Sequence, residues 1–443
     1  MSERKTMTTK SMQTRYNTHT LSNGLRVIHR QSASAVVYCG FEINAGSRHE
    51  ERGDEGLAHF CEHVTFKGTR HRRAWHILNC LESVGGDLNA FTNKEDTVYY
   101  AAILNDQLPR AVALLCDIVF SSTYPQHEID KEVAVICDEI ESYNDTPTEL
   151  IFDDFENIIF SGHPLGHNIL GNAERLRQFC TADALRFTRR HYRPENMVFF
   201  ADGDISFSRL VRLLEKNLQG VENQSNQENQ NNRNDRSSLN NRSNLNDQSS
   251  QNHQERPLCA GGQTVTMEKG THQSHVMVGT RGFAVNHPLR IPLYLLNNLL
   301  GGPGMNARLN LSLREKHGLV YTVESSMMTY SDTGLWCIYF GCDPHDVRHC
   351  LRLVGHELDR LVQQPLTPRQ LNAAKKQLKG QIGIACDNRE QFALDFGKSY
   401  LHYGWEKNVE RLMQHIEEVS AEQIQQTAQL LFAPERLTTL IYS

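Results

Sequence analysis

Three residues near the start of the chain have the types and the spacing of a metal site. The segment GLAHFCEHVTFKGT contains His59, Glu62 and His63 in the order H-x-x-E-H. On a helix, residues four apart lie one turn apart on the same face, so both imidazoles can reach one ion. Glu62 follows His59 by three residues and shares that face, so its carboxylate can address a water molecule bound to the ion.

A catalytic zinc ion also needs a third protein ligand and an open position for water. The segment KEVAVICDEIES has the apolar spacing of a helix, and Glu132 and Glu139 are two helical turns apart on one face of it. That pairing suits one metal ligand and one carboxylate that orients a ligating histidine. On pattern alone, however, a solvated acidic face with Asp138 and Glu141 as members is favoured, so this alternative stays open.

The order H-x-x-E-H is the reverse of the commoner H-E-x-x-H and is a signature of inverted zincins. Three fixed residues in five also occur by chance, in which case the two histidines only decorate a helix surface. Cys61 lies inside the motif and could be interpreted as a thiolate ligand of the metal. Because it follows His59 by two residues, it points to the opposite side of the helix, and we expect it in the core.

The elements that must position these residues fall into two halves. From about Gln219 to Arg256 the sequence consists mostly of Asn, Gln, Ser, Arg and Asp. Such a stretch buries too little apolar surface to offset its ordering entropy, so we predict a disordered linker at 219–256. It separates an N-terminal domain at 1–218, which holds the metal motif, from a C-terminal domain at 257–443.

The two halves have the pattern of distant repeats. A strand, a turn and an amphipathic helix follow one another in DTVYYAAILNDQLPRAVALLCDIV and again in DTGLWCIYFGCDPHDVRHCLRLVGHEL, with Asp332-Thr333 where Asp96-Thr97 stood. Strands come in runs, and helices of ten or more residues separate them, which favours an α+β class. We therefore expect two similar domains, each a mostly antiparallel sheet with helices packed on one face.

The composition excludes several functional classes. A formal charge of −6 over 443 residues leaves no basic stripe for nucleic acid, and no apolar run approaches the roughly 20 residues of a membrane-spanning helix. The 11 cysteines contain no C-x-x-C pair, which indicates buried free thiols in a reducing compartment. The basic N-terminus faintly suggests a transit peptide but lacks the apolar stretch of a secretory signal, so the cytoplasm is the expected location.

These residues together identify a family. The chain resembles the M16 metallopeptidases, in particular the shorter two-domain members similar to mitochondrial processing peptidase and its bacterial relatives. Their third ligand is a glutamate about 76 residues after the second histidine, and here 139 − 63 = 76. A further family glutamate, seven residues before that ligand, matches Glu132. The resemblance therefore implies Zn²⁺ held by His59, His63 and Glu139, with Glu62 as general base.

The resemblance also implies how substrate is held. Asn89, Ala90 and Phe91 match a sheet edge to which the peptide adds as a strand, and such main-chain pairing grips any extended peptide. Arg314 and Tyr321, seven residues apart, match an Arg and a Tyr that lie near the scissile bond. Without the resemblance to the family, these residues indicate only a strand with an Asn turn, an Arg at the end of a helix and a Tyr in a strand.

The activity that the resemblance implies is a zinc-dependent endopeptidase acting on peptides or unfolded polypeptide segments. The family works inside a closed chamber of four such domains, so a chain with two implies a dimer. The second half of one subunit would then face the first half of its partner. A homodimer is expected. A dedicated processing factor that acts as a heterodimer and a non-catalytic scaffold subunit stay open, although the intact ligands argue against the latter.

Overall fold

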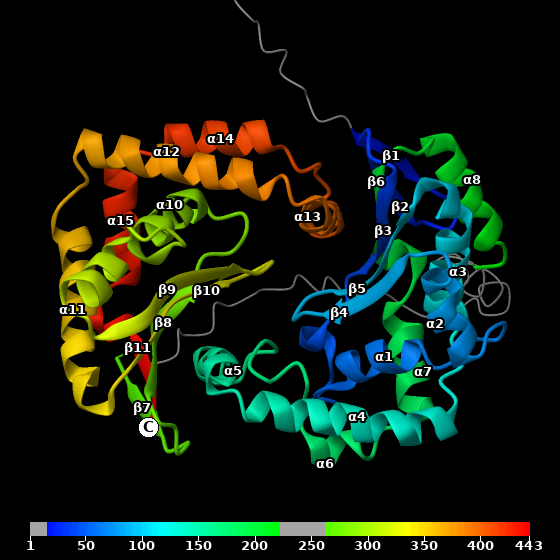
Figure 1. The fold of residues 1–443 in the computed structure, drawn as a ribbon, viewed down its shortest axis with the longest axis horizontal. Coiled ribbons are helices and arrows are strands. Elements are labelled where there is room, and N and C mark those ends of the chain that lie inside the picture. The colour runs from blue at the N-terminus through cyan, green and yellow to red at the C-terminus, as the bar shows by residue number, and fades with distance from the viewer. Residues whose placement is uncertain (1–15, 222–261) are drawn as a thin grey trace, which may run out of the picture.

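In the computed structural model, which describes residues 16–221 and 262–443, the first half folds around a six-stranded sheet of order β1-β2-β6-β3-β5-β4 (Figure 1). All neighbouring strands in it are antiparallel except β2 and β6. The strands are β1 Tyr16–Thr20, β2 Arg26–Gln31, β3 Val36–Ile43, β4 Asp87–Thr92, β5 Thr97–Leu104 and β6 Met197–Gly203. The helices are α1 Leu57–Thr65, α2 Ala74–Glu82, α3 Leu108–Ser121, α4 Gln126–Asn144, α5 Pro147–Ile159, α6 Ala173–Leu176, α7 Thr181–His191 and α8 Phe207–Asn217.

The second half contains, in its described part, a five-stranded sheet of order β7-β11-β8-β10-β9, in which only β7 and β11 are parallel. The strands are β7 Thr264–Met267, β8 Ser274–Gly282, β9 Val320–Thr329, β10 Gly334–Cys342 and β11 Thr438–Tyr442. The helices are α10 Arg290–Gly301, the π-helix η4 Asn310–Lys316, α11 Val347–Gln363, α12 Pro368–Ala385, α13 Arg389–Tyr403, α14 Val409–Glu418 and α15 Ala421–Leu431.

The two sheets are repeats of one another. The series β2-β6-β3-β5-β4 corresponds strand by strand to β7-β11-β8-β10-β9, and the parallel pair stands at the same end of each. Asp96 directly precedes β5, and Asp332 comes two residues before β10, at the equivalent turn. The two α+β units and their mostly antiparallel sheets confirm the fold class predicted from the sequence.

Each half contributes one helix that packs on the sheet of the other half. The helix α13 of the second half packs on β3 and β6, where Phe392 and Phe396 share a buried cluster with Phe200. In the opposite sense, α5 of the first half packs on β8 and β11, where Phe155 shares a cluster with Met277. Figure 1 shows both helices between the halves. The sequence predicted helices on one face of each sheet, and the exchange adds a helix of the other half on the second face.

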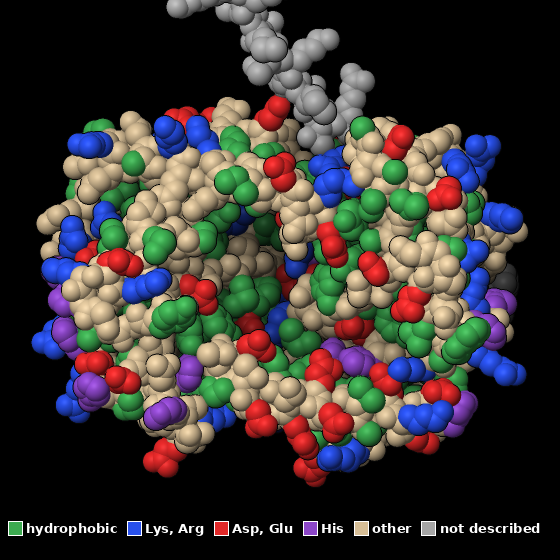
Figure 2. Space-filling model, viewed as in Figure 1, with side chains coloured by type: hydrophobic (Ala, Val, Ile, Leu, Met, Phe, Trp, Pro, Cys, Tyr) green, Lys and Arg blue, Asp and Glu red, His purple; other side chains and the backbone are tan. Residues whose placement is uncertain are grey.

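The halves enclose a central hollow, which is seen in the space-filling view of Figure 2. The domain limits at 218 and 256 stay a prediction, because the expected linker at 219–256 lies, from residue 222 on, outside the described residues. The ten cysteines of the described ranges are all free, and most are buried, as expected. Among the helices described, none combines the length and the apolarity that a bilayer-spanning segment requires.

Candidate metal centre

The helix α1, which carries the motif, has a defined start and a buried face. Gly56 precedes it with φ 96°, and a Cβ there would lie 2.8 Å from the carbonyl oxygen of Leu170, so glycine is required. The carboxylate of Glu50 accepts the N–H groups of Gly56 and Ala58 at 3.0 and 2.7 Å, which satisfies donors at the helix N-terminus. Cys61 is fully buried, which confirms its predicted place in the core.

The three predicted ligands converge. One ligand atom each from His59, His63 and Glu139 lies within 4.8 Å of the other two. The Nε2 atoms of His59 and His63 lie 3.7 and 3.3 Å from the two carboxylate oxygens of Glu139. Ligands of a tetrahedral zinc ion, bound at about 2.1 Å, are roughly 3.4 Å apart, so the three side chains fit one such ion. The exposed carboxylate of Glu139 leaves the site open on one side.

The carboxylate of Glu132 orients the imidazole of His63 through its Nδ1 atom. Its Nδ1 lies 3.0 Å from Oε1 of Glu132, and the other oxygen of Glu132 lies 2.5 Å from Nζ of Lys67. Burial would raise the pKa of Glu132, but the hydrogen bonds from His63 and Lys67 outweigh it and hold the pKa below its ordinary value. An ionised Glu132 accepts the Nδ1 proton and so leaves Nε2 free to ligate.

The two histidines differ in protonation without an ion. Burial, with the neighbouring His63, lowers the pKa of His59 to about 4, so its imidazole is neutral. Burial also lowers the pKa of His63, but hydrogen bonds to Glu132 and Glu139 outweigh this and raise it to about 9. A metal ion must therefore displace a proton from His63, and binding should release it to solvent.

Glu62 lies beside the ligands on the same helix and is 8% exposed. Thr92 Oγ1 donates to Oε2 of Glu62 at 2.7 Å. Burial raises the pKa of Glu62, and the hydrogen bond from Thr92 offsets only part of the rise. A carboxylate beside the ligands is a residue type that serves as a general base.

The predicted substrate strand lies next to this helix. Asn89, Ala90 and Phe91 belong to β4, which packs on α1 and, in the described part of the chain, pairs only with β5. Its other edge therefore offers unpaired main-chain groups, as β-strand addition requires. The edge position is confirmed, and the substrate role stays a prediction.

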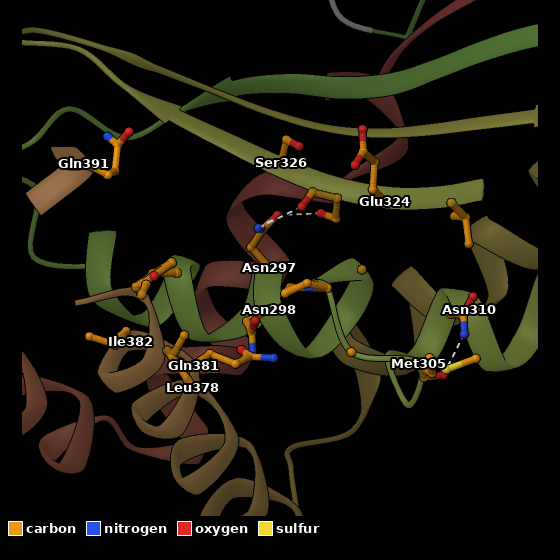
Figure 3. A pocket seen from close by; sticks show the side chains of 18 of the residues that line it. Asn297, Asn298, Met305, Asn310, Glu324, Ser326, Leu378, Gln381, Ile382 and Gln391 are labelled. Atoms are coloured by element: carbon orange, nitrogen blue, oxygen red, sulfur yellow. Dashed lines mark hydrogen bonds between the residues drawn. The ribbon is translucent and has the colours of Figure 1, made fainter. Parts of the chain in front are cut away.

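The structure brings Arg314 and Tyr321 together, but not to the metal residues. The guanidinium of Arg314 in η4 lies 5.6 Å from the ring centroid of Tyr321, which is 83% exposed on the edge strand β9. Both line a cavity of about 760 Å³ that lies wholly within the second half. Figure 3 shows polar side chains at the cavity, among them those of Asn298 from α10 and Gln381 from α12. None of the metal residues lines it.

Sequence reasoning missed two residues that the geometry places at the centre. Lys67 follows His63 by four residues, the spacing that also relates the two histidines, and this could have indicated a cation near Glu132. Thr92 directly follows the predicted strand residues 89–91, but nothing in the sequence shows which side chain it meets.

Comparison with known proteins places the chain in a family. The family model described as "Insulinase (Peptidase family M16)" matches residues 26–173, which include every proposed metal residue. A second model, "Peptidase M16 inactive domain", matches residues 180–378, which include Arg314 and Tyr321. The first half thus matches the peptidase model of the family, and the second half matches the model described as inactive.

Individual relatives cover nearly the whole chain. An uncharacterised zinc protease of Bacillus subtilis (strain 168), YmxG, is 30% identical over 96% of this chain and 97% of its own length. The beta subunit of mitochondrial-processing peptidase from Bos taurus is 31% identical over 92% of this chain and 80% of its own. The crystal structure of a protease from Helicobacter pylori has the same fold, with a TM-score of 0.85 at 21% identity over 97% of this chain and 100% of that one. The chain therefore belongs to peptidase family M16, the insulinase family of zinc metallopeptidases.

Proposed function

We propose that the protein is a zinc-dependent endopeptidase that hydrolyses peptides or unfolded polypeptide segments. The observation that carries the proposal is the convergence of His59, His63 and Glu139 within 4.8 Å, next to a buried Glu62 with a raised pKa. Relatives named zinc proteases that match almost the full chain support it. The expected substrate is an extended chain, because the neighbouring element is a free strand edge.

Each residue of the candidate metal centre would have a separate role in peptide hydrolysis. His59, His63 and Glu139 would hold the ion and leave a fourth position for water. Zinc, when bound, lowers the pKa of that water towards about 7 and polarises the scissile carbonyl. Glu62 takes the proton of the attacking water and delivers it to the leaving amine, a contribution of roughly 10²–10⁴ in rate. Glu132 keeps the ring of His63 in its ligating orientation.

The main chain of β4 would bind the peptide. An added strand pairs through its own N–H and C=O groups, so binding along Asn89, Ala90 and Phe91 depends little on the substrate's side chains. The strand ends at Thr92, beside Glu62, so a peptide bound there runs past the base. Such a site is suited to cutting within extended segments.

Arg314 and Tyr321 would act on the metal centre of a second copy of the chain. Their support is indirect: the pair lines a cavity of the second half that no metal residue shares, and Tyr321 is 83% exposed. In a dimer that joins the second half of one copy to the first half of the other, Tyr321 would donate to the developing oxyanion. A homodimer is the simplest assembly, and a heterodimer with a related subunit would use the same geometry.

The deciding experiment measures zinc content and the cleavage of a mixed peptide pool by the purified chain. We expect one zinc per chain and products that disappear after chelation. The Glu62→Gln variant is the matched control, because it keeps all three ligands: zinc should stay, and turnover should fall about 10²–10⁴-fold. Cleavage by that variant at the parental rate would assign the proton transfer to another group. A zinc-loaded parent that cuts nothing would instead support the non-catalytic subunit.

A further inference from the structure

Thr92 lies where the edge strand β4 meets the helix α1. Its Oγ1 donates to Oε2 of Glu62 at 2.7 Å, and it also lies 3.4 Å from Oγ1 of Thr97, its partner across the β4–β5 pair. The hydroxyl of Thr97 donates to the carbonyl of Ala45 at 2.7 Å. Each hydroxyl carries one proton. Because the hydroxyl of Thr97 donates its only proton to the carbonyl of Ala45, it cannot also donate to Thr92. The hydroxyl of Thr92 therefore donates its own proton to Glu62.

This contact orients the carboxylate of Glu62. In the described ranges no other hydrogen bond reaches that carboxylate, although the side chain is almost fully buried. The last of the three side-chain torsions of a glutamate, which turns the carboxylate, has a broad distribution, so packing alone leaves the carboxylate plane loosely set. The bond to Oε2 fixes the plane of the carboxylate and leaves Oε1 for the proton of a water molecule.

The end of β4 is itself held by both halves. After Thr92 the chain turns, with the N–H of Asn93 donating to the carbonyl of Asp96 at 2.8 Å. The buried carboxylate of Asp96 accepts from Nζ of Lys398 at 2.8 Å, and Lys398 belongs to the exchanged helix α13. Thr92 therefore stands between a turn anchored by the second half and a strand whose outer edge is free.

We propose that Thr92 is a positioning residue that couples the pairing of a peptide with β4 to the placement of the Glu62 carboxylate. A peptide strand that pairs with β4 restrains the strand up to its last residue, and the hydroxyl passes this restraint to the base. Thr92 contacts no reacting atom and acts only through Glu62. The kinetic part of this inference rests on the proposed endopeptidase function, whereas the placement of Glu62 does not.

The test compares Thr92→Val, which keeps the shape without the hydroxyl, with Thr92→Ser, which keeps the hydroxyl. The matched control is Thr427→Val, because Thr427 is buried in α15 and donates to the carbonyl of Gln423 at 2.7 Å, far from the metal residues in the sequence. All variants should bind zinc as the parent does. We expect kcat of Thr92→Val to fall about 10–100-fold, as for one lost hydrogen bond to a charged group, with KM nearly unchanged. Thr92→Ser should keep most of the parental kcat, and Thr427→Val all of it.

Crystal structures of the zinc-loaded parent and of both Thr92 variants give a readout that needs no turnover. The Glu62 carboxylate should keep one position in the parent and in Thr92→Ser, and should shift or split into two conformers in Thr92→Val. An unmoved Glu62 in Thr92→Val, or equal losses of kcat in the Val and Ser variants, would overturn the proposal. A parent that cuts no peptide would refute the proposed function alone, because the crystal structures would still decide whether Thr92 holds Glu62.

Discussion

The two halves place different chemistry at equivalent positions of one architecture. In the first, α1 lies between the edge strand β4 and the helix α4, and directs His59, Glu62 and His63 toward Glu139. In the second, α10 lies between the edge strand β9 and the helix α12. It contains no His, Asp or Glu and carries Asn297 and Asn298.

The buried polar groups around Asn297 satisfy one another. Asn297 donates to the carbonyl of Ser325 at 2.9 Å, and its Oδ1 accepts from the Ser325 hydroxyl at 2.5 Å and from Nε1 of Trp336 at 3.1 Å. Neutral amides and hydroxyls can close such a network without a counterion. The imidazoles and carboxylates of the first half need a proton or a cation between them, since converging carboxylates repel one another. One scaffold thus gives a candidate metal centre in one half and a neutral hydrogen-bonded cluster in the other.

The largest expected effect is the loss of the ion from the first half. His63→Ala removes one of three ligands and should empty the site, which metal analysis of the purified protein would detect. His71→Ala is the matched control: His71 is mostly exposed and pairs with Asp117 outside the ligand set. It should keep the metal at the parental level. Full zinc occupancy in His63→Ala would rule out the ligand assignment.

The second prediction tests whether the two halves meet in a dimer. Glu62→Gln and Tyr321→Phe chains should each be nearly inactive alone. When they are mixed under subunit exchange, one of the two sites of a mixed dimer combines an intact Glu62 with an intact Tyr321 of the partner chain. Random pairing then restores about a quarter of the parental activity. No recovery in mixtures with proven exchange would show that the pair does not act across chains.

The third prediction concerns the residues behind His63. Glu132→Gln should weaken zinc affinity about 10–100-fold, because the neutral amide orients the imidazole less firmly. Lys67→Met, which loses only the partner of Glu132, should weaken zinc less than Glu132→Gln does. Competition with a chelator of known affinity measures both. A Lys67→Met effect equal to or larger than that of Glu132→Gln would mean that Lys67 does not act through Glu132.

The smallest effect is expected in the second half. Asn297→Ala leaves Ser325 and Trp336 without their shared acceptor, and the free energy of unfolding should fall by about 1–3 kcal/mol. Zinc content should stay at the parental level, as the contrast between the halves requires. Denaturant unfolding and metal analysis of the same sample test both statements. Loss of zinc from an Asn297→Ala protein that keeps the native fold would contradict the proposed difference between the two halves.

Local patterns were enough to predict the centre in outline. His59, Glu62 and His63 share a face because helical periodicity is set within one turn, whatever the rest of the chain does. Glu139 was a candidate from its pairing with Glu132, but its own pattern favours a solvated surface, and only its distance of 76 residues from His63, matched to a known family, selected it. The mostly antiparallel sheets agree with the run of strands and helices in the sequence, whereas the edge position of β4 was expected only from the family resemblance.

Contacts between distant segments were decided by the tertiary structure alone. The apolar face of α5 shows that Phe155 is buried, but not that it packs on the sheet of the other half. The same holds for the exchange of α13 and for the hydrogen bond from the hydroxyl of Thr92 to Glu62. The physical reason is that the type of a residue determines whether it needs a packing or hydrogen-bonding partner when it is buried. Which partner lies within reach depends on the chain topology, which brings distant segments together.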